Sequence, residues 1–495
     1  MLFNSFEFIF AFFPLVLLGF YLIGARSSIA AARFLGLMSL VFYGWWSVQA
    51  LPLLIGSICF NYWAGGRLVP ARGAVNTARL WMLRLALMAN LGFLGIFKYA
   101  DFFIGNVNLA LGANGLQRMG ALHLVLPIGI SFYTFTQIAF LVDCWQGKVH
   151  EQRFSHYLLF VTYFPHLIAG PVLHHAQMMP QFADVKTYRL NLDRLCLGLA
   201  TFTLGLGKKL VIADPLGQYA DLVFGAVKNG LEPSVLTAWL GVVSYAFQIY
   251  FDFSGYSDMA IGIALCLGVQ LPLNFRSPYK STSIIEFWRR WHISLSNFLR
   301  DYLYIPLGGS YKGPLRRYMN LALTMVLGGL WHGAAWTFVL WGALHGAFLV
   351  VNHLWRRTRP HAIPANASRL SRILDWSLTF GCVCLAWVLF RADSLSTALA
   401  FYKGMAGFNG CHASPFAGLK TPFKQSDYYQ LFLLAGFVCL ALPSSDQLGK
   451  WVPWPMRRLR LTKVGPLATG LLTGVTLIYC LSKLSQHSPF LYFQF

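Results

Sequence analysis

The chain has 495 residues, of which 57% are hydrophobic and only 11% are charged, and its mean hydropathy is +0.55. Soluble domains carry about 25% charged residues, so this composition excludes a soluble globular protein and indicates a polytopic membrane protein. A formal net charge of +22 could suggest a nucleic-acid binder. The basic residues instead gather in short loops between apolar runs, so we expect no nucleic-acid partner.

Apolar runs of about 20 residues, the length that crosses a bilayer, recur along the chain. We expect an all-α protein with about 11–14 membrane segments, several of them short enough to be half-helices or re-entrant. The expected segments are 5–23, 34–48, 51–66, 85–104, 122–143, 157–175, 195–213, 234–251, 256–269, 318–331, 335–354, 374–391, 429–445 and 464–482. They form one membrane domain over 1–495, with simple spans in 1–120, a catalytic core in 121–355 and further spans in 356–495.

Basic clusters beside the spans mark the cytoplasmic side under the positive-inside rule, and they favour anionic lipid headgroups there. The clusters are Arg67, Arg72, Arg79 and Arg84, then Arg356, Arg357, Arg359, Arg369 and Arg372, then Arg457, Arg458, Arg460 and Lys463. No Lys or Arg precedes the first segment, whereas Arg26 and Arg33 follow it. We therefore expect an uncleaved anchor with the N-terminus outside the cell.

From residue 121 onward, Pro and Gly interrupt the apolar runs in LPIGISFYTF, YFPHLIAGPVLHH and LGLGKKLVIADP. Such breaks are tolerated at membrane depth where neighbouring helices or a cavity satisfy the freed backbone groups, so we expect broken helices around a cavity. The segment 272–317 is too charged to cross lipid. Within it, Ser283 and Glu286 have the spacing of a capping box, which predicts one amphipathic helix from about Ile284 to Leu303. An ion pair between Glu286 and Arg290 is feasible on that helix.

Histidines in this apolar context are the first candidates for chemistry. An ionisable side chain at bilayer depth costs roughly 2.5–3.5 kcal/mol on insertion scales and is read as functional by default. His332, in MVLGGLWHGAAW, is the strongest candidate, because a buried neutral imidazole can accept a proton from a hydroxyl nucleophile. The alternative is a packing histidine beside Trp331. His292, among arginines in EFWRRWH, has a weaker case, and for His345 a structural role is favoured.

Two aspartates and a basic segment are further candidates for a functional role. Asp252 and Asp258 are six residues apart, so they share no helical face unless the helix breaks between them. They serve either proton transfer or buried hydrogen bonding. The basic residues from Arg276 to Arg317 could bind an anionic cofactor or could form a positive-inside loop. The nine cysteines show no metal-type spacing, so no metal is expected.

Three stretches carry a family resemblance: FQIYFDFSGYSDMAIGIA, LNFRSPYKSTSIIEFWRRWHISLSNFLRDYLYIPLGG and NLALTMVLGGLWHGAAWTFVLWGALHG. They resemble the membrane-bound O-acyltransferase family, in particular its bacterial alginate O-acetylase membrane-subunit branch. The resemblance implies a ring of tilted helices around a central tunnel in the bacterial inner membrane. It implies catalysis by His332 of LWHG, while His292 of RRWH orients the donor or stabilises developing charge. The supporting residues would be Asp252, Asp258, Trp331 and Asp301.

The reaction implied is acetyl transfer from cytoplasmic acetyl-CoA, a donor substrate rather than a bound cofactor, for O-acetylation of an exported polysaccharide such as alginate or cellulose. Arg289, Arg290 and Arg300 would contact the CoA phosphates. A separate periplasmic partner of the SGNH type would carry the acetyl group to the polymer. Two alternatives stay open: same-family acylation of teichoic acid, peptidoglycan, lipid or protein, and a transporter of a small molecule or lipid-linked sugar. A transporter predicts an internal repeat, and the sequence shows none.

Overall fold

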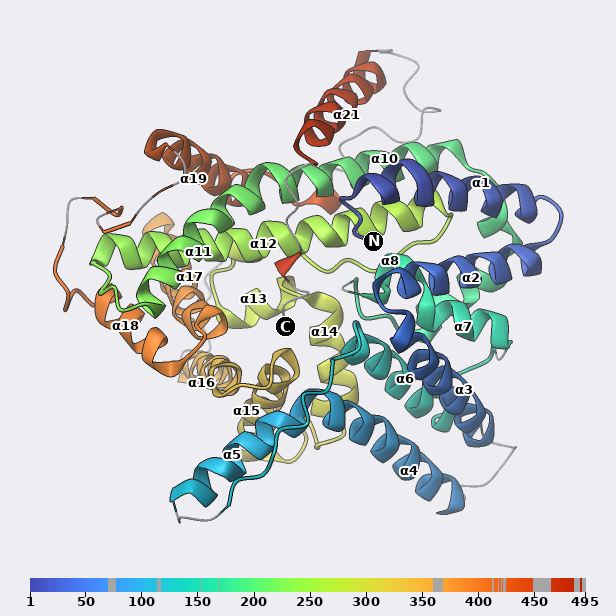
Figure 1. The fold of residues 1–495 in the computed structure, drawn as a ribbon, viewed down its shortest axis with the longest axis horizontal. Coiled ribbons are helices and arrows are strands. Elements are labelled where there is room, and N and C mark those ends of the chain that lie inside the picture. Colours follow the sequence, from blue (N-terminus) through green and yellow to red (C-terminus); the bar gives the residue numbers. More distant parts are fainter. Residues whose placement is uncertain are drawn as a thin grey trace. The chain divides into compact units, whose positions relative to one another are not determined.

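The protein is described here from a computed structural model, in which the regular elements of the described residues are helices (Figure 1). The described residues are 1–69, 77–113, 117–151, 153–168, 170–358, 368–411, 414–416, 418–419, 421, 424–447, 464–484 and 490–491. Three parts of the predicted basic clusters lie outside them: Arg72, Arg359 and the cluster Arg457–Lys463. The all-α prediction is confirmed, whereas the ring around a tunnel stays a prediction.

Contacts divide the chain into two compact units, Met1–Phe202 with Ser257–Pro272, and Thr203–Tyr256 with Leu273–Phe495. The expected division at 120 and 355 stays a prediction. In the first unit α1 packs on α2, α2 on α7, and both α3 and α4 on α6. Its elements are η1 Glu7–Phe12, α1 Phe13–Gly24, α2 Ser28–Trp46, η2 Val48–Ala50, α3 Leu51–Leu68, α4 Thr77–Leu94, η3 Gly95–Tyr99, α5 Ala100–Ala113, α6 Ile130–Trp145, α7 Phe154–Thr162, α8 Phe164–Leu167, α9 His175–Ala183, η4 Val185–Tyr188 and most of α10 Leu192–Gly207.

The second unit contains the candidate histidines. Its elements are η5 Lys208–Ala213, α11 Asp214–Lys228, most of α12 Val235–Cys266, η6 Pro278–Lys280, α13 Ile284–Arg290, α14 Ile293–Leu299, η7 Arg300–Tyr304, α15 Gly313–His332, α16 Trp336–Thr358, α17 Arg369–Arg391, α18 Leu395–Met405, α19 Gln425–Leu440 and α21 Val464–Lys483. The helices α15, α16 and α17 pack in succession, and α13 packs on α16 (Figure 1). The core of this unit is strongly aromatic, with Trp341, Trp387 and Tyr245 fully buried.

Among the described residues, six helices are long and apolar enough to cross a bilayer: Glu7–Gly24, Ser28–Trp46, Thr77–Gly112, Leu192–Lys228, Trp336–Thr358 and Arg369–Arg391. A multi-pass membrane protein is therefore confirmed. Several other expected segments form shorter or more polar helices. The expected segments 234–251 and 256–269 are wrong as separate spans, because α12 runs unbroken for 32 residues through both.

Two further expectations about helix breaks need correction. In LGLGKKLVIADP the helix does not break, because the π-helical turn η5 joins α10 to α11 and takes up the irregularity. The predicted helix Ile284–Leu303 is not one helix, since the chain leaves helical geometry at Trp291 and His292. Its N-terminus is as predicted, with the Ser283 hydroxyl accepting a hydrogen bond from the Glu286 backbone at 3.2 Å.

The α15–α16 hairpin is held together by close backbone approach. A Cβ atom on Gly329 would overlap the Phe338 carbonyl, and one on Gly342 would overlap the Met325 carbonyl. Small residues allow membrane helices to pack at such short range, where dispersion contacts and weak hydrogen bonds accumulate. The hairpin is therefore a stiff support for His332, the last residue of α15.

Replacing Gly342 with alanine is expected to lower the free energy of unfolding by about 1–3 kcal/mol, because the added methyl group forces two backbones apart. Gly381→Ala in α17 is the matched control, since no atom lies within 4 Å of the place that its added methyl group would occupy. There the same change is expected to stabilise by roughly 0.5–1 kcal/mol. Thermal unfolding in detergent measures both, and equal shifts of the two variants would contradict the tight-packing argument.

Candidate active site

His332 lies at a helix end inside an aromatic cluster. The helix α15 stops there because Gly333 is extended, with φ −162° and ψ 149°. The His332 side chain is buried, and its ring centroid lies 4.9 Å from Trp331, 5.2 Å from Trp341 and 5.2 Å from Phe390. Gly333 leaves room for the Phe338 ring, which a Cβ atom would strike. The imidazole is thus held away from bulk water by rings on three sides.

His292 occupies the break between α13 and α14. Its backbone is left-handed, with φ +42° and ψ 55°, which is uncommon for a residue other than glycine. The segment Asn274–Arg276 clamps the break, since the Ile293 amide donates to the Asn274 carbonyl at 2.9 Å and the Arg276 amide donates to the Arg290 carbonyl at 3.0 Å. Strained backbone of this kind gathers at functional sites.

The hydrogen bonds of His292 define its tautomer. Its Nδ1 lies 2.9 Å from the Asn274 Oδ1, and the same oxygen accepts a hydrogen bond from the Ser294 hydroxyl at 2.8 Å. Because a carbonyl oxygen only accepts, Nδ1 of His292 carries the proton and Nε2 carries the lone pair. Burial lowers the pKa of His292 to about 3, so the ring is neutral at pH 7. This tautomer favours orienting a hydroxyl or thiol over donating to an oxyanion.

The buried, neutral His292 predicts how the stability of the protein depends on pH. The helices α13 and α14 are too short to cross a bilayer, at seven residues each. The pKa of His292 is lower in the folded protein than its ordinary value of 6.5, so the unfolded chain binds the proton more readily. The stability from neutral His292 is therefore complete above pH 6.5 and is lost as the pH falls toward 3. His292→Gln is expected to flatten this acid loss in detergent unfolding curves, whereas the exposed-histidine variant His123→Gln should not. Parallel curves for wild type and His292→Gln would contradict the assignment.

The indole ring of Trp331 contacts both histidines that the sequence predicts as functional. The Trp331 ring centroid lies 6.5 Å from that of His292 and 4.9 Å from that of His332. The structure thus brings together His292, Trp331 and His332, as the motifs imply. Among the described residues, no group of three or more His, Cys, Asp or Glu side chains has the arrangement of a metal site.

His345 belongs to the same cluster, although the sequence favours a structural role for it. Its ring is 4.9 Å from Trp341, which in turn is 5.2 Å from His332. The Trp288 indole donates a hydrogen bond to the Nδ1 of His345 at 3.3 Å. The Nε2 of His345 is fully buried and has no hydrogen-bond partner within the described part of the chain. The signal that could have revealed it is its position four residues after Trp341, on the same face of α16.

The predicted donor-binding arginines lie on the short helices beside this cluster. Arg290 pairs with Glu286 at 2.6 Å, as the spacing predicts, and Arg289 is exposed. Arg300 is exposed and binds the adjacent Asp301 at 2.7 Å, so Asp301 serves as its partner. A role for these arginines at CoA phosphates stays a prediction.

Asp252 is part of a buried ion cluster rather than of the histidine site. Its Oδ1 lies 2.5 Å from the Lys209 ammonium, which also lies 2.7 Å from Asp214. The Leu491 amide donates to the other Asp252 oxygen at 3.0 Å. Asp258 is buried in the first unit. Because α12 is continuous through both aspartates, they face different neighbours, as their spacing predicts.

A helical membrane protein with two buried imidazoles around one indole has the form of a membrane-embedded enzyme. Residues 146–391 match the model of MBOAT, the membrane-bound O-acyltransferase family. The chain is 40% identical to the peptidoglycan O-acetyltransferase of Helicobacter pylori, over all of this chain and 98% of that protein. It is 41% identical to the probable alginate O-acetylase AlgI of Pseudomonas putida over the full length of both. A teichoic acid D-alanyltransferase of Bacillus subtilis is 26% identical over 54% of this chain and 69% of that protein.

The chain belongs to the membrane-bound O-acyltransferase family. It is therefore an acyltransferase, and the resemblance drawn from its motifs is confirmed. The transporter alternative is not supported, because the family and the named relatives are acyltransferases.

Proposed function

We propose that the protein transfers acetyl groups from cytoplasmic acetyl-CoA for the O-acetylation of an exported polysaccharide. The observation that carries this proposal is His332, a buried imidazole at a helix end that the Trp331 ring links to His292, in a chain that aligns end to end with two O-acetylating relatives. Both relatives are named for polymers built of sugars.

In the proposed reaction His332 accepts the proton of the acceptor hydroxyl as its oxygen attacks the thioester carbonyl. A carbon–oxygen bond forms, the carbon–sulfur bond breaks, and the CoA thiolate leaves and takes the proton from His332. The lone pair on Nε2 of His292 orients the hydroxyl or the donor. The aromatic rings around His332 exclude water, which suppresses hydrolysis of the thioester.

The acceptor is reached through a separate partner in this proposal. The family resemblance of the motifs implies such a partner. We infer a periplasmic SGNH-type protein that takes the acetyl group from the membrane enzyme and delivers it to the glycan. The enzyme then lies in the bacterial inner membrane with its N-terminus outside and the 355–372 loop in the cytoplasm.

Two glycans compete as the final acceptor, because alginate and peptidoglycan each appear in the name of a relative aligned over the full length. The test is the ester-linked acetate of purified exopolysaccharide and purified peptidoglycan from cells with and without the gene. Loss of acetate from one fraction, restored by the wild-type gene but not by His332→Ala, identifies the polymer. Unchanged acetate in both fractions, with loss of D-alanine esters instead, would overturn the proposal.

A further inference from the structure

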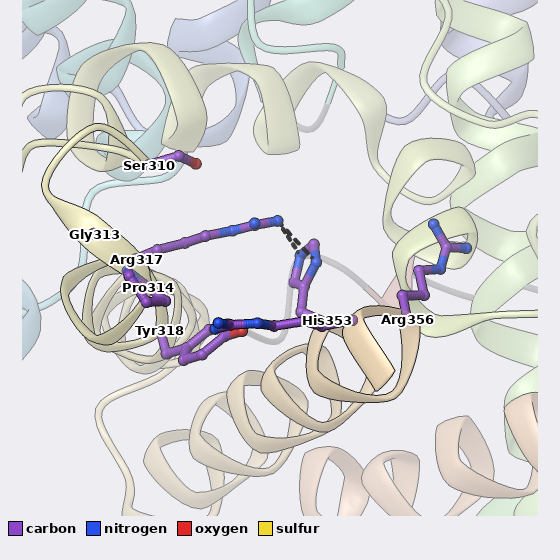
Figure 2. Close-up of a pocket in the computed structure, with 8 residues that line it drawn as sticks. Ser310, Gly313, Pro314, Arg317, Tyr318, His353 and Arg356 are labelled. Carbon is purple, nitrogen blue, oxygen red and sulfur yellow. Dashed lines mark hydrogen bonds between the residues drawn. The ribbon is translucent and has the colours of Figure 1, made fainter. Parts of the chain in front are cut away.

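A basic cavity lies at the end of the α15–α16 hairpin that is remote from His332 (Figure 2). It has a volume of about 550 Å³ and is lined by Arg317, Tyr318, His353, Arg356 and Arg357, together with the first turn of α15 at Gly313 and Pro314. None of the residues that line it is acidic. Figure 2 shows the Arg317 side chain reaching across to His353, with Arg356 beyond it on α16.

Two arginines of this cavity have neutral hydrogen-bond partners. Arg317 donates a hydrogen bond to Nδ1 of His353 at 2.9 Å, and an imidazole that accepts at Nδ1 is neutral. Arg356 donates to the Ser283 hydroxyl at 3.2 Å, again a neutral group. Within the described ranges, no carboxylate lies within ion-pair distance of Arg317, Arg356 or Arg357.

A further arginine adds to the positive charge around the cavity. His353 lies within electrostatic range of Arg289 as well as Arg317 and Arg356. The carboxylate of Glu286, on the helix that Ser283 caps, is held by Arg290. Arg317, Arg356 and Arg357 line one cavity, and like charges repel, so an anion bound there would relieve that repulsion.

Arginine is suited to phosphate, because its planar fork makes two parallel hydrogen bonds to phosphate oxygens. The N-terminal turn of the 20-residue helix α15 also borders the cavity, and its dipole favours negative charge. We propose that this cavity binds the phosphate groups of a phosphate ester, either the nucleotide end of an acyl-CoA or the headgroup of an anionic phospholipid.

The position suits a long donor substrate. Arg317 and His332 are fifteen residues apart on α15, a rise of about 22 Å. An extended pantetheine arm covers roughly 16 Å, which is most of this rise. A CoA molecule with its phosphates here would direct its thioester toward His332. The identity of the ligand as acyl-CoA rests on the proposed function, whereas the phosphate chemistry does not.

The experiment measures binding to the purified full chain in nanodiscs of neutral phosphatidylcholine, with CoA and with pantetheine, which lacks phosphates. The variants are Arg317→Gln and Arg357→Gln, with Arg372→Gln in the neighbouring helix α17 as the matched control. CoA binding is expected to weaken about tenfold in each cavity variant and to be unchanged in the control. Pantetheine binding should be the same in all four proteins. Thermal unfolding of each variant checks that the fold is retained.

A second arm distinguishes the lipid source. Phosphatidylglycerol that stays bound after detergent extraction is quantified for the same proteins. Loss of retained phosphatidylglycerol with unchanged CoA affinity assigns the phosphate site to the lipid headgroup. If neither ligand responds to the cavity variants, or if Arg372→Gln has the same effect as they do, the proposal is overturned. Because binding is measured without turnover, the outcome is independent of whether the protein transfers acetyl groups.

Discussion

Replacing His332 with alanine is expected to lower the rate of acyl transfer by about 10²–10⁴-fold, the usual contribution of a positioned general base. The loss should appear in kcat rather than in the KM for the donor, because the imidazole acts on the proton of the acceptor. The measurement is steady-state transfer by purified protein in lipid. His123→Ala, which removes an exposed histidine in the first unit, is the control and should match wild type.

The variant His332→Ala also distinguishes a packing role of His332 from a catalytic role. The change leaves a cavity among the rings of Trp331, Trp341 and Phe390 that has the size of an imidazole. Added imidazole is therefore expected to restore part of the rate of His332→Ala. A variant with wild-type turnover would remove His332 from catalysis. A variant that unfolds and is not rescued would place His332 in the structural core.

Replacing Lys209 with methionine is expected to cost about 3–5 kcal/mol of unfolding free energy, because the change leaves two carboxylates without their cation. Lys209 is 1% exposed and lies between Asp252 and Asp214. The Phe490 ring lies 4.7 Å from the same ammonium group, so the C-terminal segment also loses a contact. The measurement is denaturant or thermal unfolding in detergent.

A surface pair in the same unit is the matched control. Lys228 pairs with Asp393 at 2.8 Å, but both side chains are at least half exposed. Lys228→Met is expected to cost at most about 1 kcal/mol, because solvent screens the pair. The double variant Lys209→Met with Asp252→Asn removes both charges and should recover part of the lost stability. A similar cost for Lys209→Met and Lys228→Met would contradict the buried ion cluster.

Much of the site could be predicted from the sequence because its chemistry is local. His332 stands out as the sole ionisable group in a long apolar run, and the indole of Trp331 next to it links it to His292. The N-cap at Ser283 and the ion pair of Glu286 with Arg290 depend on spacing along one helix, so they also emerge from the sequence.

What the sequence could not predict depends on segments far apart in the chain. The break at His292 is set by Asn274, eighteen residues earlier, whose carbonyl and side chain replace helical hydrogen bonds. Asp252 finds Lys209 only through the packing of two long helices. The arginine cavity combines α15 and α16, which a positive-inside interpretation treats as separate flanks of two spans.

His345 shows a further limit of prediction from the sequence. A histidine in an apolar run is equally consistent with a packing and a catalytic role, and only the shared contact with Trp341 places it near His332. Its Nε2 is buried and has no hydrogen-bond partner among the described residues. Such a group in a low-dielectric site is costly unless water or substrate satisfies it.

The proposed function is acetyl transfer across the membrane by a site built on His332. The most direct test reconstitutes the protein in sealed vesicles with the SGNH-type partner and glycan inside and radiolabelled acetyl-CoA outside. We expect ester-linked label on the enclosed glycan for wild type and none for His332→Ala, with intact CoA staying outside. Label that enters the vesicles as intact acetyl-CoA, or equal labelling by the two proteins, would contradict it.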